Sequence, residues 1–332
     1  MSRPKHVLVM RFAALGDVAA MASVLQRRAG QNPDVQFTIL THRMLLPLFD
    51  GLTNVRAVPL DKTQSIRRIF CSLRGLHPTH VIDGHSNLRT ICLRTLFFLS
   101  GVSVRSLPKY RMRRWRLVRS RRKVLQPMLP WWKVYDRLFA GCGLSPVRMT
   151  DPPVIVPRRA DDGHFRIGVA PFAYYPGKVW PLEKMKELVR RLSSVPGCTV
   201  WLFGAPGDRA VLDEWAAECP GTVNVPAVSG GFSSELEIIK SLHLMISMDS
   251  ANMHFASWAG VPVVSVWGAT HPYAGFYGWR QDPDWAVQVP LECRPCSTNG
   301  GRQCRRGDCL CMNSITVDMV MDKVRKVLPE LN

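Results

Sequence analysis

The sequence predicts an α/β protein of two Rossmann-like, doubly wound lobes. Short apolar runs alternate with segments that carry apolar residues at helical spacing, and this alternation occurs twice along the 332 residues. A stretch with several prolines, residues 151–162, separates the two series. A chain of this length can form two lobes of ordinary size, each with its own core.

The first lobe is expected to span residues 1–155. Its apolar runs predict strands at 6–11, 37–41, 55–58 and 80–82, and its helical spacings predict helices at 18–28, 43–49, 63–75 and 89–99. No segment reaches the roughly 20 apolar residues that a spanning helix needs, since Arg94 interrupts the most apolar stretch. The N-terminal apolar run is also too short for a signal peptide.

The second lobe is expected to span residues 156–312, followed by a C-terminal helix within 313–332 that packs back toward the first lobe. Strands are predicted at 166–170, 200–203, 244–246 and 263–267, and helices at 183–192, after the capping residues 233–235, at 253–259 and at 315–328. The charged residues and glycines between these runs fall in turns after strands. Parallel α/β sheets bind their ligands at such turns.

The formal net charge of +19 is concentrated in one part of the chain. Residues 84–135 contain thirteen Lys or Arg and no Asp or Glu, and residues 105–123 alone contain ten of these basic residues, interleaved with aromatic side chains. This pattern suits single-stranded nucleic acid, an anionic membrane surface or a solvated basic face. Because the stretch lacks acidic partners, we favour a membrane-facing or acceptor-binding role, for which we select Arg113, Arg114, Arg121 and Arg122.

The turn after the apolar run 244–246 is the strongest candidate for a phosphate site. It reads Asp249, Ser250, Ala251, Asn252, Met253, His254, and leads into a helix that Gly260 and Pro262 end. A helix N-terminus at the carboxyl end of a parallel strand offers free N–H groups and a partial positive charge. Such a site binds a phosphate or a diphosphate.

Three further turns carry candidate side chains. Lys178 follows Gly177 in a loop that continues into Trp180 and Pro181, where its charge can neutralise a diphosphate. Asp208 closes a glycine-bearing turn and either binds ribose hydroxyls or caps the next helix. In the first lobe, Asp17 ends the turn after the first strand.

The same lobe holds a second turn with charged residues, from Asp83 to Arg89. It is either an acceptor-binding turn or a helix-capping turn.

Together these motifs resemble glycosyltransferase family 9, the heptosyltransferases. The matching features are a strand followed by R-x-x-x-x-G-D ending at Asp17, the loop P-x-x-x-x-x-x-K-x-W-P around Lys178, and D-[TS]-[GA]-x-x-H at 249–254, where Ala251 replaces the usual glycine. The resemblance implies the GT-B architecture, two lobes facing a cleft. It also implies an inverting transfer of heptose from ADP-heptose to a lipopolysaccharide core or lipid A-type acceptor.

The resemblance also assigns roles. Asp17 is the implied general base, and the donor would contact Lys178, Asp208, Asp249, Ser250, Ala251, Met253 and His254. Asp83 and Arg89 would contact the acceptor. No cofactor is required, no nucleic acid is expected as a partner, and the enzyme would work in the cytoplasm, peripherally on the inner membrane.

Five of the ten cysteines cluster between residues 293 and 311, and Cys293, Cys296, Cys304 and Cys309 are candidate zinc ligands. The spacing lacks a second C-x-x-C pair, so we favour the absence of a metal. Two other functions stay open. A nucleotide-sugar epimerase of the same two-lobed plan would turn over the donor without an acceptor, and a basic nucleic-acid-binding protein would bind RNA or DNA in a salt-sensitive way.

Overall fold

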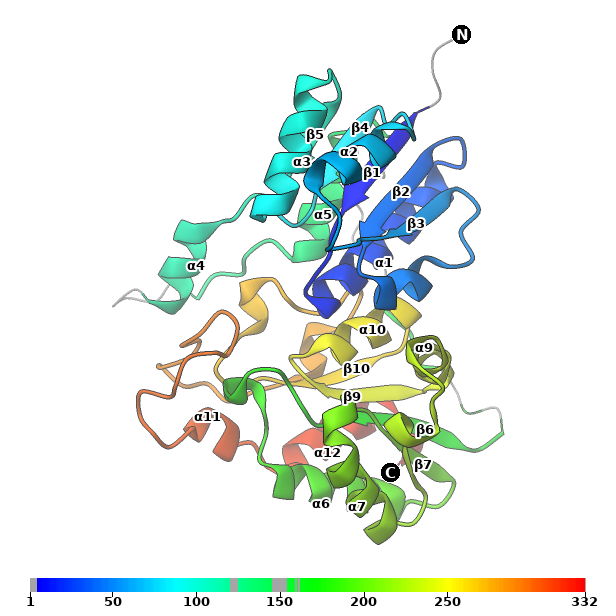
Figure 1. Ribbon diagram of the computed structural model, residues 1–332. Helices are drawn as coiled ribbons and strands as arrows, with labels where there is room; N and C mark the ends of the chain where they lie inside the picture. The colour runs from blue at the N-terminus through cyan, green and yellow to red at the C-terminus, as the bar shows by residue number, and fades with distance from the viewer. Residues whose placement is uncertain (1–4, 120–124, 145–153, 159, 161, 332) are drawn as a thin grey trace. The chain divides into compact units, whose positions relative to one another are not determined.

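The computed structural model describes residues 5–331, except 120–124, 145–153, 159 and 161. The chain divides into two compact units, and each has its own parallel sheet (Figure 1). Unit 1 comprises residues 1–109 and 131–151. Unit 2 comprises residues 110–130 and 152–332. The predicted α/β class with two doubly wound sheets is confirmed.

Unit 1 is built on a five-stranded parallel sheet in the order β3-β2-β1-β4-β5. Its strands are β1 (His6–Met10), β2 (Gln36–Thr41), β3 (Val55–Pro59), β4 (His80–Asp83) and β5 (Ser103–Ser106). Its helices are α1 (Leu15–Gln31), α2 (Ile66–Arg74), α3 (Leu88–Leu99) and α5 (Trp131–Ala140), with a 3₁₀ helix at Arg43–Phe49.

Alternate residues of β1 point to opposite faces of this sheet and bury both. Leu8 and Met10 pack in a cluster with residues of α2 and α3. The other face is covered by α1, which packs against α5. A buried ion pair joins these two helices, since Arg28 Nε donates to Asp136 Oδ1 at 2.7 Å. Both faces of the sheet are therefore covered, as a parallel sheet requires.

Unit 2 is built on a six-stranded parallel sheet in the order β11-β10-β9-β6-β7-β8. Its strands are β6 (Phe165–Ala170), β7 (Cys198–Leu202), β8 (Thr222–Asn224), β9 (Leu244–Met248), β10 (Val263–Val266) and β11 (Ala286–Val287). Its helices are α4 (Arg111–Val118), α6 (Leu182–Ser193), α7 (Arg209–Glu218), α8 (Val225–Val228), α9 (Phe232–Ser241), α10 (Ala251–Ala259), α11 (Leu310–Asn313) and α12 (Val317–Val327). Short 3₁₀ helices lie at Pro176–Lys178, Pro206–Asp208, Pro272–Ala274, Pro283–Trp285 and Pro329–Leu331.

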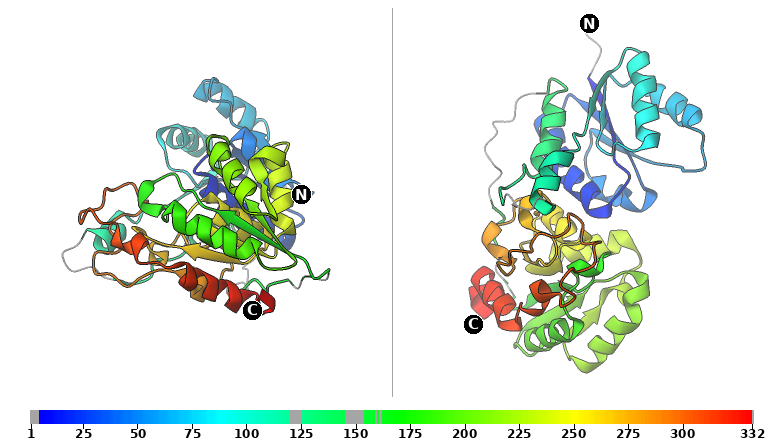
Figure 2. Two further views of the ribbon diagram at one scale, coloured as in Figure 1. Left: turned by 90° about the horizontal axis from the view of Figure 1, so that it is seen from below. Right: turned by 90° about the vertical axis from the view of Figure 1, so that its left-hand side faces the viewer.

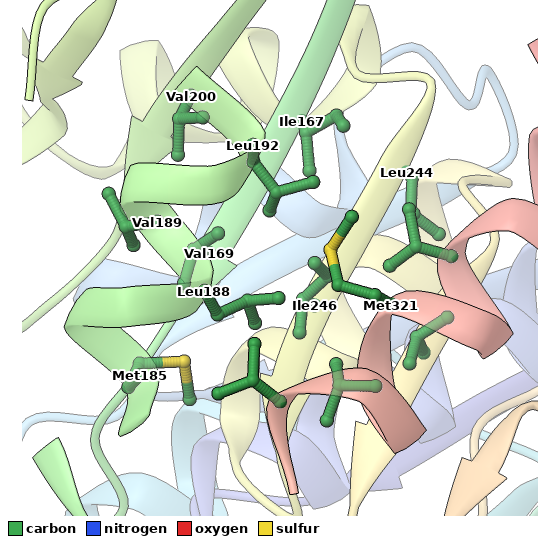
Figure 3. Packing of buried hydrophobic residues seen from close by; sticks show 14 of the residues in the cluster. Ile167, Val169, Met185, Leu188, Val189, Leu192, Val200, Leu244, Ile246 and Met321 are labelled. Carbon is green, nitrogen blue, oxygen red and sulfur yellow. The ribbon is translucent and has the colours of Figure 1, made fainter. Parts of the chain in front are cut away.

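The core of unit 2 lies between the sheet and the helices α6 and α12, which run side by side along one face (Figures 1 and 2). Figure 3 shows Leu188 and Leu192 of α6 and Met321 of α12 packed against Val169 and Ile246 of the central strands. All five side chains are buried. On the other face α9 packs against α10. These two layers hold the carboxyl ends of β6 and β9 in place.

The observed division of the chain differs from the expected one in one respect. Residues 110–130 belong to unit 2, although they precede the proline-rich stretch, because Leu117, Val118 and Met128 pack on Ala274. The C-terminal helix α12 packs on α6 and on the strands β10 and β11 of unit 2.

None of the helices in the described part of the chain is long and apolar enough to cross a membrane.

Candidate functional site

The carboxyl end of β1 carries an ion pair between Arg11 and Asp17. Arg11 directly follows β1, and Asp17 is the third residue of α1, so the β1–α1 turn brings them together. The buried Arg11 also donates to the Gly84 carbonyl, and the Ala14 N–H donates to Asp17 Oδ2 at 3.4 Å. Arg11 is anchored on two sides, and the carboxylate of Asp17 is the more exposed member of the pair. The turn therefore presents a fixed carboxylate.

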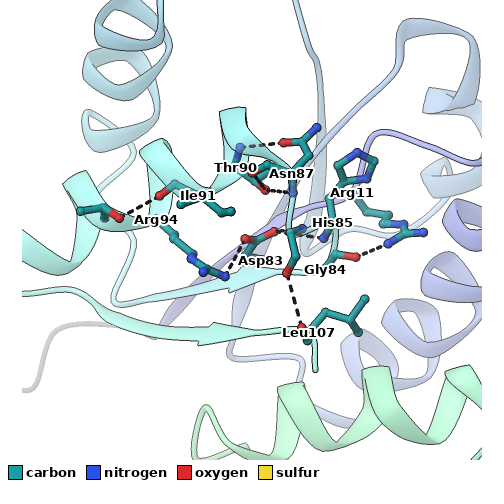
Figure 4. Close-up of polar contacts among 11 residues, drawn as sticks. Arg11, Asp83, Gly84, His85, Asn87, Thr90, Ile91, Arg94 and Leu107 are labelled. Carbon is teal, nitrogen blue, oxygen red and sulfur yellow. Dashed lines mark hydrogen bonds and ion pairs between the residues drawn. The ribbon is translucent and has the colours of Figure 1, made fainter. Parts of the chain in front are cut away.

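Asp83 lies at the end of β4, beside β1, but it does not pair with Arg89. Its Oδ1 accepts hydrogen bonds from the His85 and Ser86 N–H groups at 3.0 and 2.8 Å, and its Oδ2 pairs with Arg94 at 3.1 Å (Figure 4). Arg89 instead donates to the Lys62 carbonyl at 3.1 Å. Asp83 is fully buried and both of its oxygens have partners within unit 1, so it shapes the turn, whereas Asn87 caps α3.

His85 is a residue that sequence reasoning did not select. Its ring lies 5.2 Å from that of Phe12, near the Arg11–Asp17 pair. Burial and then the charge of Arg11 lower the pKa of His85, although a hydrogen bond to the Ala13 backbone opposes the shift. The imidazole is therefore neutral at pH 7. The one feature of the sequence that could have identified His85 was its position in the turn after strand β4.

In unit 2, the turn between β9 and α10 pairs Asp249 with Lys178. Lys178 Nζ lies 2.8 Å from Asp249 Oδ2, and the Thr270 hydroxyl donates to the same oxygen at 2.8 Å. Asp249 is buried and Lys178 is the more exposed partner. A cap of α10 was one expected role of Asp249, but Ser250 occupies the N-cap position and Asp249 pairs with Lys178. The other expected role, contact with a sugar hydroxyl, stays a prediction.

The first turn of α10 contains the other residues that the motif selected. Ala251 and His254 are half-buried, and the Met253 side chain is fully buried, so Met253 has only its N–H group to offer a ligand. The Ser250 hydroxyl lies 3.1 Å from that of Ser247. An α-helix leaves its first four N–H groups without intrahelical partners, and those of α10 follow Asp249 directly in the chain. A negatively charged group fits there.

Close backbone contacts place Lys178 beside this turn. A side chain on Gly177 would put its Cβ 2.7 Å from the Gly300 carbonyl oxygen and 3.0 Å from Ala269 Cβ, so only glycine fits. Gly300 has φ +83° and lies against the Lys178 side chain. The glycine before the lysine was visible in the sequence, but its contact with residue 300 was not.

Arg294 organises the loop after β10 and was also missed from the sequence. This buried guanidinium donates to the carbonyls of Gly268 at 2.6 Å, Trp267 at 3.1 Å and Thr270 at 3.0 Å. It thereby holds the backbone of Thr270, whose hydroxyl binds Asp249. As one of four arginines between residues 293 and 311, Arg294 gave no signal of this role.

The Asp208 carboxylate accepts a backbone hydrogen bond within the turn that precedes α7. Its Oδ2 accepts the Ala205 N–H at 2.8 Å, just before α7. This contact engages one of the two carboxylate oxygens within the turn, and the Asp208 side chain makes no cap hydrogen bond to α7. Its contact with ribose hydroxyls stays a prediction.

The basic residues and the cysteines complete the selected set. Arg113 and Arg114 lie on α4, with guanidinium carbons 5.7 Å from the Tyr110 ring and 5.8 Å from the Phe276 ring, whereas Arg121 and Arg122 lie outside the described residues. Within the described ranges, no three His, Cys, Asp or Glu side chains are placed to hold a metal ion. Cys293, Cys296 and Cys304 are partly buried, and Cys309 is exposed.

Comparison with known proteins gives the following matches. Residues 158–304 match the model of glycosyltransferase family 9 (heptosyltransferase). The lipopolysaccharide core heptosyltransferase OpsX of Haemophilus influenzae is 21% identical over 284 residues, which cover 81% of this chain and 80% of OpsX.

Solved structures share the fold over nearly the whole chain. A glycosyl transferase family 9 protein from Veillonella parvula superposes with a TM-score of 0.72 at 17% identity, covering 99% of both chains. The E. coli heptosyltransferase WaaC, solved with ADP, gives a TM-score of 0.68 at 16% identity and covers 97% of this chain and 99% of WaaC.

Proposed function

Because this chain is a glycosyltransferase of family 9, we propose that it transfers a heptose from ADP-heptose to a lipopolysaccharide core or lipid A-type acceptor. The observation that carries the proposal is the Lys178–Asp249 ion pair at the N-terminus of α10, inside the two motifs that the family shares. The printed names of OpsX and of WaaC with ADP support the choice of sugar, acceptor and nucleotide.

In this proposal the donor diphosphate binds at the first turn of α10. The N–H groups of Ala251 and its neighbours and the ammonium of Lys178 receive the phosphate oxygens. Asp249, whose carboxylate also accepts the Thr270 hydroxyl, fixes the direction of Lys178. As the bond to the sugar breaks, the negative charge that grows on the leaving diphosphate is stabilised by these groups, with no divalent metal needed.

Asp17 acts as the general base. The acceptor hydroxyl attacks the anomeric carbon while the bond to the diphosphate breaks, the hydroxyl proton passes to the Asp17 carboxylate, and ADP leaves. A single displacement inverts the anomeric centre and needs one base and no covalent intermediate. Arg11 supports this role because it fixes the carboxylate from its buried side.

The acceptor is a glycolipid, so the protein must reach a membrane surface. We propose that Arg113 and Arg114 of α4, with Arg121 and Arg122, dock it on the anionic cytoplasmic face of the inner membrane. Each Lys or Arg near an anionic surface contributes about 1 kcal/mol. Replacing all four with glutamine should release the protein from anionic vesicles at moderate salt, and binding that persists unchanged would refute this role.

ADP release from ADP-heptose tests the proposed function. With purified lipopolysaccharide core acceptor, we expect release of ADP and a product heavier by one heptose, and no change on adding EDTA. Donor turnover without acceptor would favour the epimerase alternative. RNA or DNA binding that weakens steeply with salt, without any transfer, would favour the nucleic-acid alternative.

A further inference from the structure

The outward side of α3 in unit 1 is apolar although it faces solvent. Leu88, Phe98 and Leu99 are 83%, 68% and 74% exposed, which places them among the most exposed large hydrophobic side chains of the described residues. The other exposed residues of this helix are Cys92 and Thr95, so none of its exposed side chains is charged. We call these five residues the α3 face.

The spacing of these residues places them on one side of the helix. Positions 88, 92, 95 and 99 follow one another at intervals of four, three and four residues, which is the repeat of a single helix face. The opposite side holds Leu93 and Phe97, which are fully buried in the core of unit 1. The helix is therefore apolar on both sides, and only one of them is covered.

The neighbouring helix α2 shows the ordinary pattern of a surface helix. It packs beside α3, and the rings of Phe70 and Phe97 meet edge to face with their centroids 4.9 Å apart (Figure 1). Its buried residues are the apolar Ile69 and Leu73. Its charged residues are all exposed: Arg67, Arg68 and Arg74. Contact with water therefore accounts for the outer side of α2 but not for that of α3.

The surface around the α3 face is basic. Residues 62–109, all of which the structure describes, contain eight Lys or Arg and one acidic residue, Asp83. Asp83 is fully buried and pairs with Arg94, so it gives the surface no negative charge. Arg74 of α2 reaches the end of α3, where it donates to the Ser100 hydroxyl at 3.4 Å. Positive charge thus accompanies the exposed apolar side chains.

This combination favours one class of partner. A second copy of the chain would bring basic surface against basic surface, which opposes association. An anionic bilayer complements both features, because its phosphates attract Lys and Arg while the boundary of its acyl chains accepts Leu and Phe. A single apolar helix face also suits a helix that lies in the plane of the membrane surface.

We propose that the α3 face inserts into the headgroup region of an anionic membrane, with Leu88, Phe98 and Leu99 at the acyl boundary. This inference rests on the proposed function, which requires a membrane-borne acceptor. It adds an apolar attachment in unit 1 to the arginines assigned to docking in unit 2. Stable attachment of a peripheral protein takes two such contributions, because a single one gives only marginal binding.

Co-sedimentation with vesicles that contain phosphatidylglycerol tests the proposal. The variant L88S/F98S/L99S leaves the net charge unchanged and removes only apolar surface, so docking by charge alone predicts no change. We expect its partition to fall by about tenfold or more, because the apolar area that leaves water on insertion is lost. The variant L88I/F98L/L99I, which keeps the face apolar, should partition as wild type.

The matched control is V154S/V156S, which removes two exposed apolar side chains from unit 2 and should partition as wild type. Unchanged partition of L88S/F98S/L99S, or an equal loss in V154S/V156S, would overturn the proposal. Thermal melting shows whether each variant is folded.

Size-exclusion chromatography separates a membrane from a second copy of the chain as the partner. If wild-type protein forms a dimer that L88S/F98S/L99S abolishes, while vesicle partition stays the same, the α3 face joins two copies and the proposal is wrong.

Heptose transfer separates this proposal from the proposed function. L88S/F98S/L99S should transfer heptose to delipidated acceptor at the wild-type rate, whereas transfer to acceptor embedded in vesicles should fall. The vesicles of the binding assay contain no acceptor, so partition does not depend on transfer. Wild-type protein that partitions through the α3 face but transfers no heptose would refute the proposed function and leave the membrane face standing.

Discussion

Each unit contains an ion pair with one buried and one more exposed member, and the more exposed member is an acid in unit 1 and a base in unit 2. In unit 1, an arginine that is 8% exposed holds Asp17, which is 26% exposed, and in unit 2 an aspartate that is 4% exposed holds Lys178, which is 15% exposed. The members of each pair follow the carboxyl ends of central strands of their own sheet. The more exposed member is available to a ligand and the buried one fixes its position. Unit 1 therefore presents a carboxylate suited to accept a proton, and unit 2 an ammonium suited to bind phosphate.

A third ion pair shows what a purely structural pair looks like. Arg28 is 1% exposed and Asp136 11% exposed, and the pair joins α1 to α5. Neither member is accessible to a ligand, so we expect this pair to affect stability alone.

The largest effect is expected at Asp17. Asp17→Asn keeps a side chain that can accept hydrogen bonds from Arg11 and Ala14 but removes the base, so kcat should fall by about 10²–10⁴-fold. The Kd for ADP should stay within a few-fold. Transfer rates for this variant and for the exposed control Asp34→Asn check the prediction, and a near-wild-type kcat would remove Asp17 from the mechanism.

Arg28→Met should act on folding instead. It leaves the Asp136 carboxylate buried without its partner, which costs about 3–5 kcal/mol in free energy of unfolding. The double variant R28M/D136L should recover most of this loss, since an apolar pair of similar volume can replace a buried ion pair. Urea unfolding measures both. A stable Arg28→Met protein with low kcat would contradict the assignment of this pair to structure.

Lys178→Met should weaken ADP binding by about 10–100-fold, because a hydrogen bond to a charged group contributes about 1.5–3 kcal/mol. Adenosine, which lacks phosphates, should bind as it does to wild type. Lys326→Met, which removes an exposed ammonium paired with Asp284, is the control. If ADP and adenosine lose affinity equally, Lys178 does not bind the diphosphate.

A smaller effect is expected from His271, beside the loop that holds Thr270. Burial, and then the charge of Arg294, lower the pKa of His271 to about 4, against about 6.5 in an unfolded chain. Between these values the unfolded chain binds more protons, so the contribution to stability is complete above pH 6.5 and is lost as the pH falls toward 4.

His271→Asn, which keeps an acceptor for the Tyr273 N–H, should therefore flatten the decline in unfolding free energy over this range. The exposed His77→Asn is the control. An unchanged slope in His271→Asn would show that this imidazole does not control the decline.

The elements around the site were predictable because their signals are local. The apolar run at 244–246 predicted β9, and the helical spacing that stops at Gly260 predicted α10, whose C-cap is Gly260 with φ +75°. The sequence analysis did not predict strand β5. This strand is only four residues long, contains an arginine and lies at the edge of the sheet, where it pairs with β4 alone. The expected cap at 233–235 was also misplaced, because α9 begins at Phe232 after Gly231.

The partners within the site were not predictable, because they are distant in sequence. Lys178 and Asp249 were each selected by motif, but nothing local indicates that they pair, and Asp249 was assigned to a cap or a sugar hydroxyl. Asp83 was matched with Arg89 by spacing, whereas Arg94, one and a half helical turns further along α3, faces it. The place of residues 110–130 in unit 2 likewise depends on packing against Ala274.

The affinity of Asp249→Asn for ADP, measured by calorimetry beside wild type and Lys178→Met, tests the central claim most directly. If the buried carboxylate only positions Lys178, its loss removes a competitor for the ammonium, and Asp249→Asn should bind ADP at least as tightly as wild type while Lys178→Met binds it more weakly. A loss in Asp249→Asn as large as that in Lys178→Met, with an unchanged melting temperature, would contradict the claim that the exposed member of each pair meets the ligand.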